Sequence, residues 1–284
     1  MTSSEKRTSA VLAQRREGSR VEKRGWTILK FFRDNADAEL RKHRWAEAAL
    51  ADTEAHYPTL LGIKGCNAEG ALVMEYIDGL VSLRIPYLAF MKGKTDDLSN
   101  FGAAGRALGY LHSAMPLPAR ELPDPMPPLH LDTLPVLGSE SVVLLHGDYG
   151  FSNVFWSETR DQIVVLDASP NHFMTSHPLQ TGTRYVDLAN FVSCLCGLVP
   201  PRHFAMMRWT RAPSVIEAFL NGYAATSHFT PDRTTVLRSA HQTANAYFGY
   251  SYPSVLRRVL ARAWFATHVK LIGRHYERLS KQSR

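Results

Sequence analysis

The sequence predicts an α+β fold, because short apolar runs of strand character and one long helix-like segment are separated by polar turns. The runs that predict buried strands are 26–32, 71–75, 142–145 and 162–166. The segment 36–56 has no Gly or Pro and is rich in Ala, Glu, Leu and Arg, which favours one helix. With 284 residues, 45% of them hydrophobic, the chain is long enough for one bilobal unit or two small domains.

The polar loop between the last two runs carries the clearest chemical signal. It reads His146-Gly147-Asp148-Tyr149-Gly150-Phe151-Ser152-Asn153, and Asp167 closes the apolar run that follows. Phosphoryl transfer requires a carboxylate that orients the attacking hydroxyl and oxygen ligands that hold Mg²⁺ against the nucleotide phosphates. An ordinary Gly-Asp turn is the alternative interpretation. The order of strand, loop, strand and carboxylate favours the catalytic one.

This segment resembles the aminoglycoside phosphotransferase and choline kinase group of kinase-like small-molecule phosphotransferases, whose loop runs His-Gly-Asp-x₄-Asn. The resemblance spans about residues 20–195. It implies a bilobal protein-kinase-like fold, with a small β-rich N-lobe containing one main helix at 1–74, a hinge at 75–79 and a larger, mostly helical C-lobe at 80–284. It also implies a phosphotransferase that uses ATP or GTP with Mg²⁺ and phosphorylates a hydroxyl group of a small molecule.

Two N-lobe residues are expected to hold the nucleotide phosphates. In such families a strand lysine pairs with a helical glutamate, and Lys30 is the central lysine of the run 26–32. Glu47 follows it by seventeen residues, a separation like that of the family. By comparison, Glu39 is too close to Lys30 and Glu54 is too near the end of the helix. Glu47 is therefore the expected partner of Lys30.

Adenine is expected to bind at the hinge. The resemblance implies that the carbonyl of Glu75 and the N–H of Ile77 contact the adenine edge. The loop that covers the phosphates departs from the family pattern, because only one glycine is available there. Gly18 and Ser19 are the candidates, and a simple hairpin turn is the alternative for them.

The resemblance also assigns roles around the catalytic loop. Asp148 accepts or orients the proton of the acceptor hydroxyl, while Asn153 and Asp167 bind Mg²⁺. His146 braces the loop. Asp187, in the helix start Tyr-Val-Asp-Leu-Ala, is expected to accept backbone N–H groups of the loop, although a helix N-terminal Asp is favoured in any case.

Other interpretations remain open at this stage. Asp167 is followed by Ala-Ser-Pro, so a second carboxylate ligand is missing and the number of Mg²⁺ ions is undecided. A catalytically weak nucleotide-binding or regulatory module is one alternative. A protein kinase is another, but the stretch 167–187 is short and lacks Ala-Pro-Glu, which favours a small-molecule acceptor. His112 is expected to be a packed helix residue.

Composition bears on one connecting segment and on the cellular location. Seven of the sixteen prolines fall in 115–135, which predicts an extended connection within the C-lobe. The first eighteen residues contain no apolar signal segment, and no stretch approaches the apolar length of a membrane span. The cysteines Cys66, Cys194 and Cys196 give no disulfide framework. A cytoplasmic protein is therefore expected.

Charge bears on the acceptor. Residues 171–284 hold 14 Lys and Arg against 4 Asp and Glu, whereas residues 1–170 hold 19 against 22. A polycationic aminoglycoside would be repelled by this excess, so an anionic or neutral acceptor is expected. Specific nucleic acid binding is not expected, because no recognised motif accompanies the basic residues. The segment 255–281 is predicted to be a solvated basic helix. A basic face that binds a polyanion or a membrane surface is the alternative for this region, and the oligomeric state is left open.

Overall fold

The computed structural model describes residues 9–14, 20–31, 40, 43–44, 59–60, 63–113, 142–166, 181–196, 207–252 and 254–282. Several predicted site residues lie outside these ranges, namely Gly18, Ser19, Glu47 and Asp167. Most of the expected helix at 36–56 and the proline-rich connection at 115–135 also lie outside them.

A five-stranded antiparallel sheet forms the N-terminal part. Its strands, in spatial order, are β1 (Ser9–Gln14), β2 (Arg20–Arg24), β3 (Thr27–Phe31), β6 (Leu72–Glu75) and β5 (Ile63–Cys66). Gly25 has φ +63°, the left-handed backbone that a two-residue turn between β2 and β3 requires. The central strand β3 pairs with β2 on one side and β6 on the other, which places Lys30 beside Val21 and Leu72.

A second sheet lies between the first sheet and the helices. It consists of β4 (Thr59–Leu60), β10 (Gln162–Val165), β9 (Val154–Ser157) and β7 (Leu80–Ser82). The strand β9, which starts directly after the polar loop, is not among the runs that the sequence predicts as strands. The strand before the loop is β8 (Val142–Leu144). It pairs with β11 (Thr181–Thr183) in a separate two-stranded sheet. The two predicted strands that flank the loop therefore belong to different sheets.

A small apolar cluster connects the first two sheets. It contains Ile28 from β3, Leu72 and Met74 from β6, Val164 from β10, and Ile77 from the segment that runs from β6 to β7. The chain crosses from one sheet to the other at this segment, where the sequence predicts the hinge. The cluster therefore fixes the hinge segment between the two sheets.

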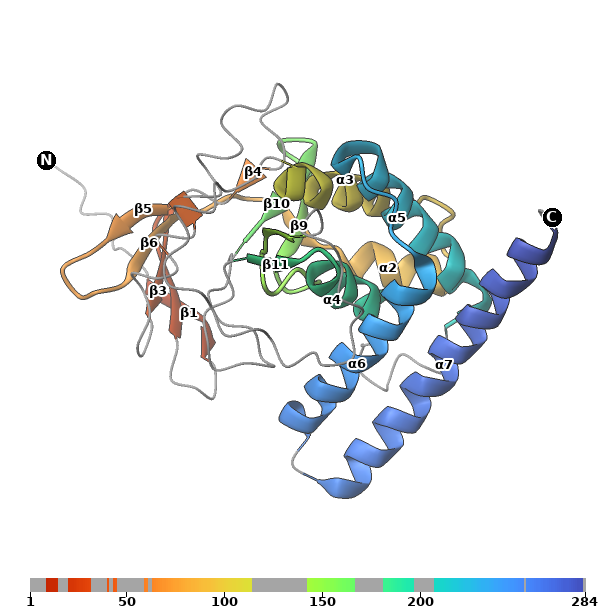
Figure 1. Cartoon of the computed structure of the whole chain (residues 1–284). Coiled ribbons are helices and arrows are strands. Elements are labelled where there is room, and N and C mark those ends of the chain that lie inside the picture. Colours follow the sequence, from red (N-terminus) through yellow and green to blue (C-terminus); the bar gives the residue numbers. More distant parts are fainter. Residues whose placement is uncertain are drawn as a thin grey trace, which may run out of the picture.

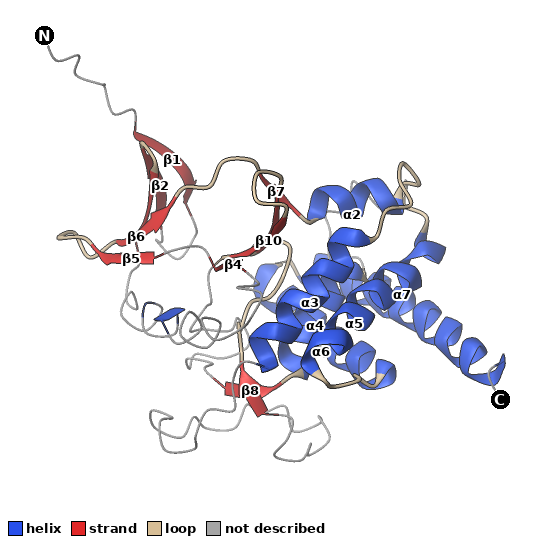
Figure 2. Cartoon of the chain, turned by 90° about the horizontal axis from the view of Figure 1, so that it is seen from above, coloured by secondary structure: helices blue, strands red, loops and turns tan. Residues whose placement is uncertain are grey.

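The C-terminal part is mostly helical. Its helices are α2 (Arg84–Met91), α3 (Ser99–Ser113), α4 (Tyr185–Leu195), α5 (Ala212–Ser227), α6 (Arg233–Ser251) and α7 (Val255–Gln282), with a 3₁₀ turn at Trp209–Arg211. Figures 1 and 2 show the strands on one side and these helices gathered on the other. The predicted α+β division into a small strand-rich part and a larger helical part is confirmed.

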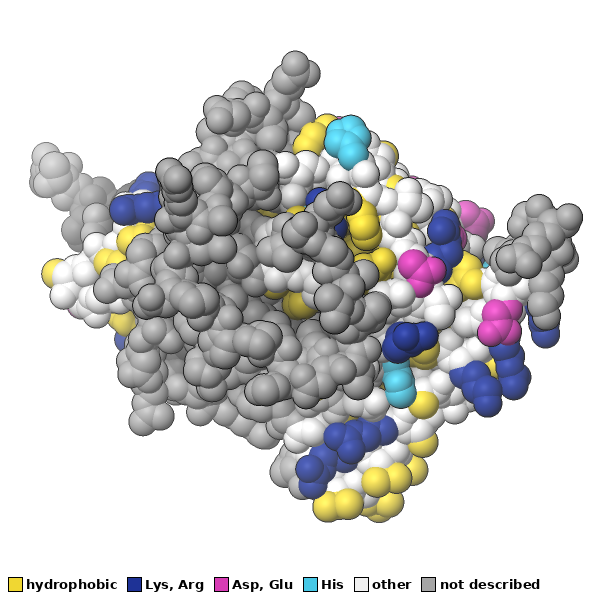
Figure 3. Space-filling model, in the orientation of Figure 1, with side chains coloured by type: hydrophobic (Ala, Val, Ile, Leu, Met, Phe, Trp, Pro, Cys, Tyr) yellow, Lys and Arg dark blue, Asp and Glu magenta, His cyan; other side chains and the backbone are white. Residues whose placement is uncertain are grey.

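The long helix α7 packs beside α6 along the outer side of the bundle (Figure 1). Lys, Arg and apolar side chains are visible on its outer surface in Figure 3. Within the described ranges, no helix combines the length and the apolar character that crossing a bilayer requires.

Glycines allow α3 and α5 to pack at close range. A Cβ atom at Gly105 of α3 would collide with the Phe219 carbonyl group and would meet the Tyr223 nitrogen at 2.8 Å. A Cβ atom at Gly222 of α5 would collide with the Gly102 carbonyl group. These backbones are in contact, so little room remains for a side chain between them.

We expect Gly105→Ala to lower the free energy of unfolding by about 1–3 kcal/mol, since the methyl group must displace backbone of α5. The measurement is the thermal or denaturant midpoint of the purified variant. Gly102→Ala is the matched control on the same helix, because its Cβ would lie 3.6 Å from the Ala218 carbonyl oxygen. Equal midpoints for the two variants would contradict the close-packing argument.

Candidate active site

The polar loop occupies the turn between β8 and β9. Gly147 has φ +90°, a backbone conformation that only glycine adopts without strain. The N–H groups of Asn153 and Val154 both donate to the Gly150 carbonyl oxygen, at 2.9 Å and 3.0 Å, and close the second half of the loop as a tight turn. The loop therefore folds back on itself and brings its first and last polar residues together.

Asp148 and Asn153 meet across this turn. The Nδ2 group of Asn153 donates to the Asp148 carbonyl oxygen at 2.8 Å and to the Asp148 carboxylate at 2.9 Å. Asn153 is buried, whereas Asp148 is partly exposed. Both bonds use the amide nitrogen, so the amide oxygen of Asn153 takes no part in them. The carboxylate of Asp148 is held in one orientation while it remains accessible.

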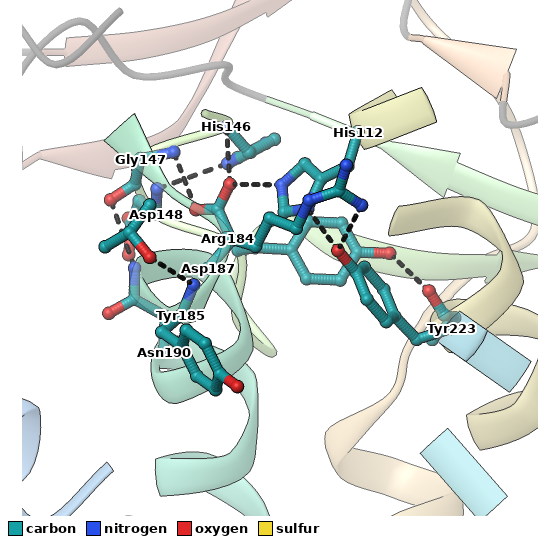
Figure 4. Close-up of polar contacts among 12 residues, drawn as sticks. His112, His146, Gly147, Asp148, Arg184, Tyr185, Asp187, Asn190 and Tyr223 are labelled. Carbon is teal, nitrogen blue, oxygen red and sulfur yellow. Dashed lines mark hydrogen bonds and ion pairs between the residues drawn. The ribbon is translucent and has the colours of Figure 1, made fainter. Parts of the chain in front are cut away.

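Asp187 on α4 binds the backbone of the loop. Its carboxylate accepts hydrogen bonds from the backbone N–H groups of His146, at 2.7 Å, and Gly147, at 2.9 Å (Figure 4). One turn further along α4, Asn190 donates to the Gly147 carbonyl oxygen at 3.2 Å. Residues three apart on a helix share a face, so both side chains point at the same turn of the loop.

His146 connects the loop to the end of β10. Its Nε2 lies 2.7 Å from the Leu166 carbonyl oxygen, and its Nδ1 accepts the Asp148 N–H at 3.2 Å. This pair of bonds assigns the proton to Nε2, because a carbonyl can only accept and an N–H can only donate. Leu166 in turn donates its N–H to the Asn153 carbonyl oxygen at 2.8 Å. The loop is thus fastened to the residue that precedes Asp167.

A row of hydrogen bonds extends from Asp187 into the helices. Asp187 lies 3.2 Å from the Nε2 of His112, and the Nδ1 of His112 lies 2.9 Å from the Tyr223 hydroxyl. Arg184 donates to the same hydroxyl at 3.5 Å. Figure 4 shows these contacts in a row. Because an ionised carboxylate can only accept, the consistent direction is Arg184 to Tyr223, Tyr223 to His112 and His112 to Asp187.

Burial and hydrogen bonding set the protonation states of this row. Burial raises the pKa of Tyr223 to about 12, which keeps its hydroxyl available as a donor. Burial likewise lowers the pKa of His112 and keeps the ring neutral. Burial acts to raise the pKa of Asp187, but the hydrogen bond from His112, the neighbouring imidazoles and the Gly147 N–H outweigh it and hold this pKa below its ordinary value. Asp187 is therefore an ionised carboxylate that accepts hydrogen bonds from a neutral imidazole and two backbone N–H groups.

The structure places Lys30 in the interior of the five-stranded sheet. It is buried on β3, in register with Leu72 of β6. A buried ammonium group requires an anionic or polar partner. The expected partner Glu47 lies outside the described residues, so the Lys30–Glu47 pair stays a prediction.

The hinge residues follow directly on β6. Glu75 pairs with Thr27 at the end of the strand, and its side chain lies 3.4 Å from Arg160. The Tyr76 N–H donates to the Trp26 carbonyl oxygen at 3.3 Å, whereas the Ile77 N–H donates to no residue in the described part of the chain. A backbone donor left over beside an apolar cluster suits recognition of a nucleobase edge.

The structure thus gathers His146, Asp148 and Asn153 on one loop that is bound by Asp187 of α4. Lys30, Glu75 and Ile77 lie on the strand-rich side. Sequence reasoning missed the roles of Asn190 and Tyr223, and it treated His112 only as a packed helix residue. Asn190 could have been found from its position three residues after Asp187 on one helix. Tyr223 is more than a hundred residues from His112 and gave no local signal.

No known protein-family model matches this sequence, and no curated protein matches it. Solved structures do. A microcompartment-associated aminopropanol kinase has a TM-score of 0.59 at 14% identity, covering 95% of this chain and 92% of its own. A choline/ethanolamine kinase family protein from Mesorhizobium loti gives 0.53 at 13% identity, covering 93% and 87%.

The aminoglycoside phosphotransferase APH(2")-IIa, in a ternary complex with streptomycin and ATP, gives a TM-score of 0.54 at 13% identity, covering 91% of this chain and 93% of its own. These likenesses extend over nearly the whole of each chain. They confirm the bilobal protein-kinase-like fold that the sequence predicted.

The buried row of hydrogen bonds makes stability depend on pH. The unfolded chain binds a proton at His112 near pH 6.5, whereas the folded protein binds it only at lower pH, because burial lowers the pKa of this ring. The unfolded state therefore binds more protons as the pH falls below about 6.5, and the free energy of unfolding decreases. We expect the thermal midpoint to fall between about pH 7 and pH 5, and to fall less in His112→Gln.

His275→Gln is the control for this experiment, since His275 is an exposed histidine of α7. It should keep the pH dependence of the unmodified protein. Identical pH dependence in His112→Gln and the unmodified protein would show that His112 is not held neutral by the fold.

Proposed function

We propose that this protein is a phosphotransferase that uses Mg²⁺ and ATP, or GTP, to phosphorylate a hydroxyl group of a small molecule. The observation that carries the proposal is the Asp148–Asn153 pair on a loop whose backbone is bound by Asp187. The match of fold to solved structures of small-molecule phosphotransferases supports it. A cytoplasmic location accompanies the proposal.

In this proposal Asp148 orients the acceptor hydroxyl and takes its proton. Its partly exposed carboxylate can reach a ligand, and the hydrogen bond from Asn153 fixes its direction. Phosphoryl transfer of this kind depends on positioning and on electrostatic stabilisation more than on covalent catalysis. The Asp187 anchor serves the same purpose, because a loop that cannot shift keeps the base at a constant distance from the acceptor.

The residues at the loop fit a magnesium ion. Mg²⁺ prefers oxygen ligands, and the amide oxygen of Asn153 is not used in the bonds to Asp148. We propose that Asn153 and Asp167 hold the ion, which when bound neutralises charge on the nucleotide phosphates. Within the described ranges no group of three His, Cys, Asp or Glu side chains is placed to bind a metal, and Asp167 lies outside them.

The nucleotide would lie between the two parts. We propose that the Glu75 carbonyl group and the Ile77 N–H bind the base, and that Lys30, paired with Glu47, stabilises phosphate charge. The buried position of Lys30 and the unused donor at Ile77 support this assignment. Gly18 and Ser19 remain the proposed cover of the phosphates.

The acceptor is proposed to be anionic or neutral. The excess of ten positive charges in residues 171–284 opposes a polycation such as an aminoglycoside. Arg84 adds a cation beside the loop itself. Its backbone N–H donates to the Ser82 hydroxyl at 3.3 Å, and Ser82 donates to the Phe151 carbonyl oxygen at 2.7 Å, so the backbone of Arg84 is linked to the loop.

The pKa of the Cys194 thiol responds to the charges of both Asp148 and Arg84. Burial raises the pKa of its thiol to about 11, while the Asp148 carboxylate acts in the same direction and the Arg84 guanidinium in the opposite one. Cys194 would lie 3.5 Å from a Cβ atom at Gly150, so it packs against the loop. Both a cation and the proposed base therefore act on this thiol, and we propose that an acceptor with a hydroxyl and a negative group suits the region.

We expect Asp148→Asn to reduce turnover by about 10²- to 10⁴-fold, because the amide cannot accept the hydroxyl proton. Nucleotide binding should persist. The measurements are ADP formation with a panel of hydroxylated anionic, neutral and cationic metabolites, and the thermal midpoint with and without Mg-ATP or Mg-GTP. A nucleotide at a hundredfold its dissociation constant should stabilise both proteins by about 2.7 kcal/mol.

Asp161→Asn is the matched control, because Asp161 is exposed in the turn between β9 and β10 and asparagine tolerates its positive φ. It should retain full turnover. Unchanged turnover in Asp148→Asn would reject the assignment of the base. Absence of stabilisation by either nucleotide would reject the nucleotide site.

A further inference from the structure

The first two turns of α7 expose large apolar side chains to solvent. Val255 and Leu256 are each 66% exposed, Leu260 is 60% exposed and Val259 is 56% exposed. Single exposed apolar residues are common on protein surfaces, but four on adjacent positions of one helix are not. They form a continuous apolar stripe.

This stripe lies on the side of α7 that faces away from the bundle. The residues that α7 buries against the other helices are Phe265, His268 and Ile272, which share the opposite face. The stripe residues follow the spacing i, i+1, i+4 and i+5, so they stack along two turns of one outward side. No helix or strand of the described chain covers them.

Positive charge surrounds the stripe. Arg257, Arg258 and Arg262 lie between and just after its residues, and Arg257 and Arg262 are exposed. From residue 233 to residue 276 the chain has seven Lys and Arg and no Asp or Glu. Figure 3 shows apolar and basic side chains together at the corner where α6 meets α7. We call this set of Val255, Leu256, Val259, Leu260 and the three arginines the α7 tip.

A hollow adjoins the α7 tip on the side of α6. It has a volume of about 530 Å³ and is lined by His241, Asn245, Arg262, Ala263 and Ala266. Arg262 donates to the Asn245 carbonyl oxygen at 3.1 Å, which holds its guanidinium at the wall. A guanidinium beside an open hollow, next to an apolar stripe, can bind a phosphate group whose attached chains lie along the stripe.

We propose that the α7 tip docks on the surface of a membrane that contains anionic phospholipids. The leucines and valines would enter the boundary between headgroups and acyl chains, and the arginines would bind lipid phosphates around them. Helices that lie in this boundary combine an apolar face with Lys and Arg and bind by buried apolar area plus attraction to anionic lipid. The tip has both features and lacks carboxylates that would oppose them.

The charge and side-chain types of the tip favour this occupant over two others. A second copy of the chain would bring equal patches together across a two-fold axis, so its arginines would face arginines. An acidic protein would satisfy the charge, but protein interfaces depend on aromatic anchors in pockets, and the stripe offers only Val and Leu on a projecting corner (Figure 1).

Vesicle co-sedimentation of the full chain tests the proposal. We expect binding to vesicles of phosphatidylcholine mixed with phosphatidylglycerol, little binding to phosphatidylcholine alone, and release by high salt, which screens the arginines. The proposal is independent of the phosphotransferase activity, because the experiment uses neither nucleotide nor acceptor.

Paired variants separate the two contributions. Leu256→Ser with Leu260→Ser should weaken binding at least about tenfold, the loss expected when buried leucine surface is removed. Arg257→Gln with Arg262→Gln should weaken it by about fivefold per arginine and reduce its salt dependence. Leu271→Ser is the matched control: Leu271 is 52% exposed on α7 but lies about 16 Å beyond Leu260 along the helix. It should bind as the unmodified protein does.

Thermal midpoints should be unchanged in all these variants, since the substituted side chains are exposed. Failure of the unmodified chain to bind the mixed vesicles would overturn the proposal, and so would an equal loss in Leu271→Ser. Light scattering provides the third outcome. A dimer that Leu256→Ser with Leu260→Ser converts to a monomer, without vesicle binding, would identify the stripe as an interface between two copies instead.

Discussion

The candidate site depends on one buried carboxylate. Asp187 has no exposed surface, and a carboxylate in that position is costly unless all of its bonds are made. Two of those bonds come from the backbone of the loop, at His146 and Gly147, and one comes from His112. The loop cannot move without removing two donors from a buried charge. The energetic cost of an unpaired buried charge, several kcal/mol, is therefore what fixes the loop in the shape that presents Asp148.

The packing of α3 against α5 positions the third donor to Asp187, the imidazole of His112. His112 reaches Asp187 from α3, and its other ring nitrogen is occupied by Tyr223 from α5. The two helices can approach closely because Gly109, three residues before His112, has no side chain. A Cβ atom there would lie 2.7 Å from the Tyr223 carbonyl oxygen. A side chain there would push α5 away and open the contact between imidazole and phenol. Small residues in the helical core thus determine the geometry of a loop several contacts away.

Sequence reasoning succeeded where the information is local. The residues 146–153 lie within one turn, so their types and spacing predicted the loop directly, and the apolar runs predicted β3, β6 and β10. Contacts between distant segments could not be predicted in this way, as His112 and Tyr223 illustrate. The helix α7 shows a different limit. The sequence predicted a solvated basic helix, but apolar residues occur on both of its sides, and periodicity cannot tell which side packs on the bundle. Only the fold shows that Leu256 and Leu260 face outward.

In the C-terminal region, the fold pairs or buries most of the carboxylates and leaves the cations of α7 toward solvent. Of the region's four carboxylates, Asp187 is buried under the loop, Glu217 pairs with Arg233 at 2.7 Å, and Asp232 caps the N-terminus of α6. These three carboxylates bind local partners, so their negative charge does little to offset the positive charge of α7. The positive field is consequently directed to solvent along the outer side of α7 and its tip. A field in that position attracts an anionic surface, which supports the proposed docking surface, whereas the acceptor class depends on the net charge of the C-terminal region as a whole.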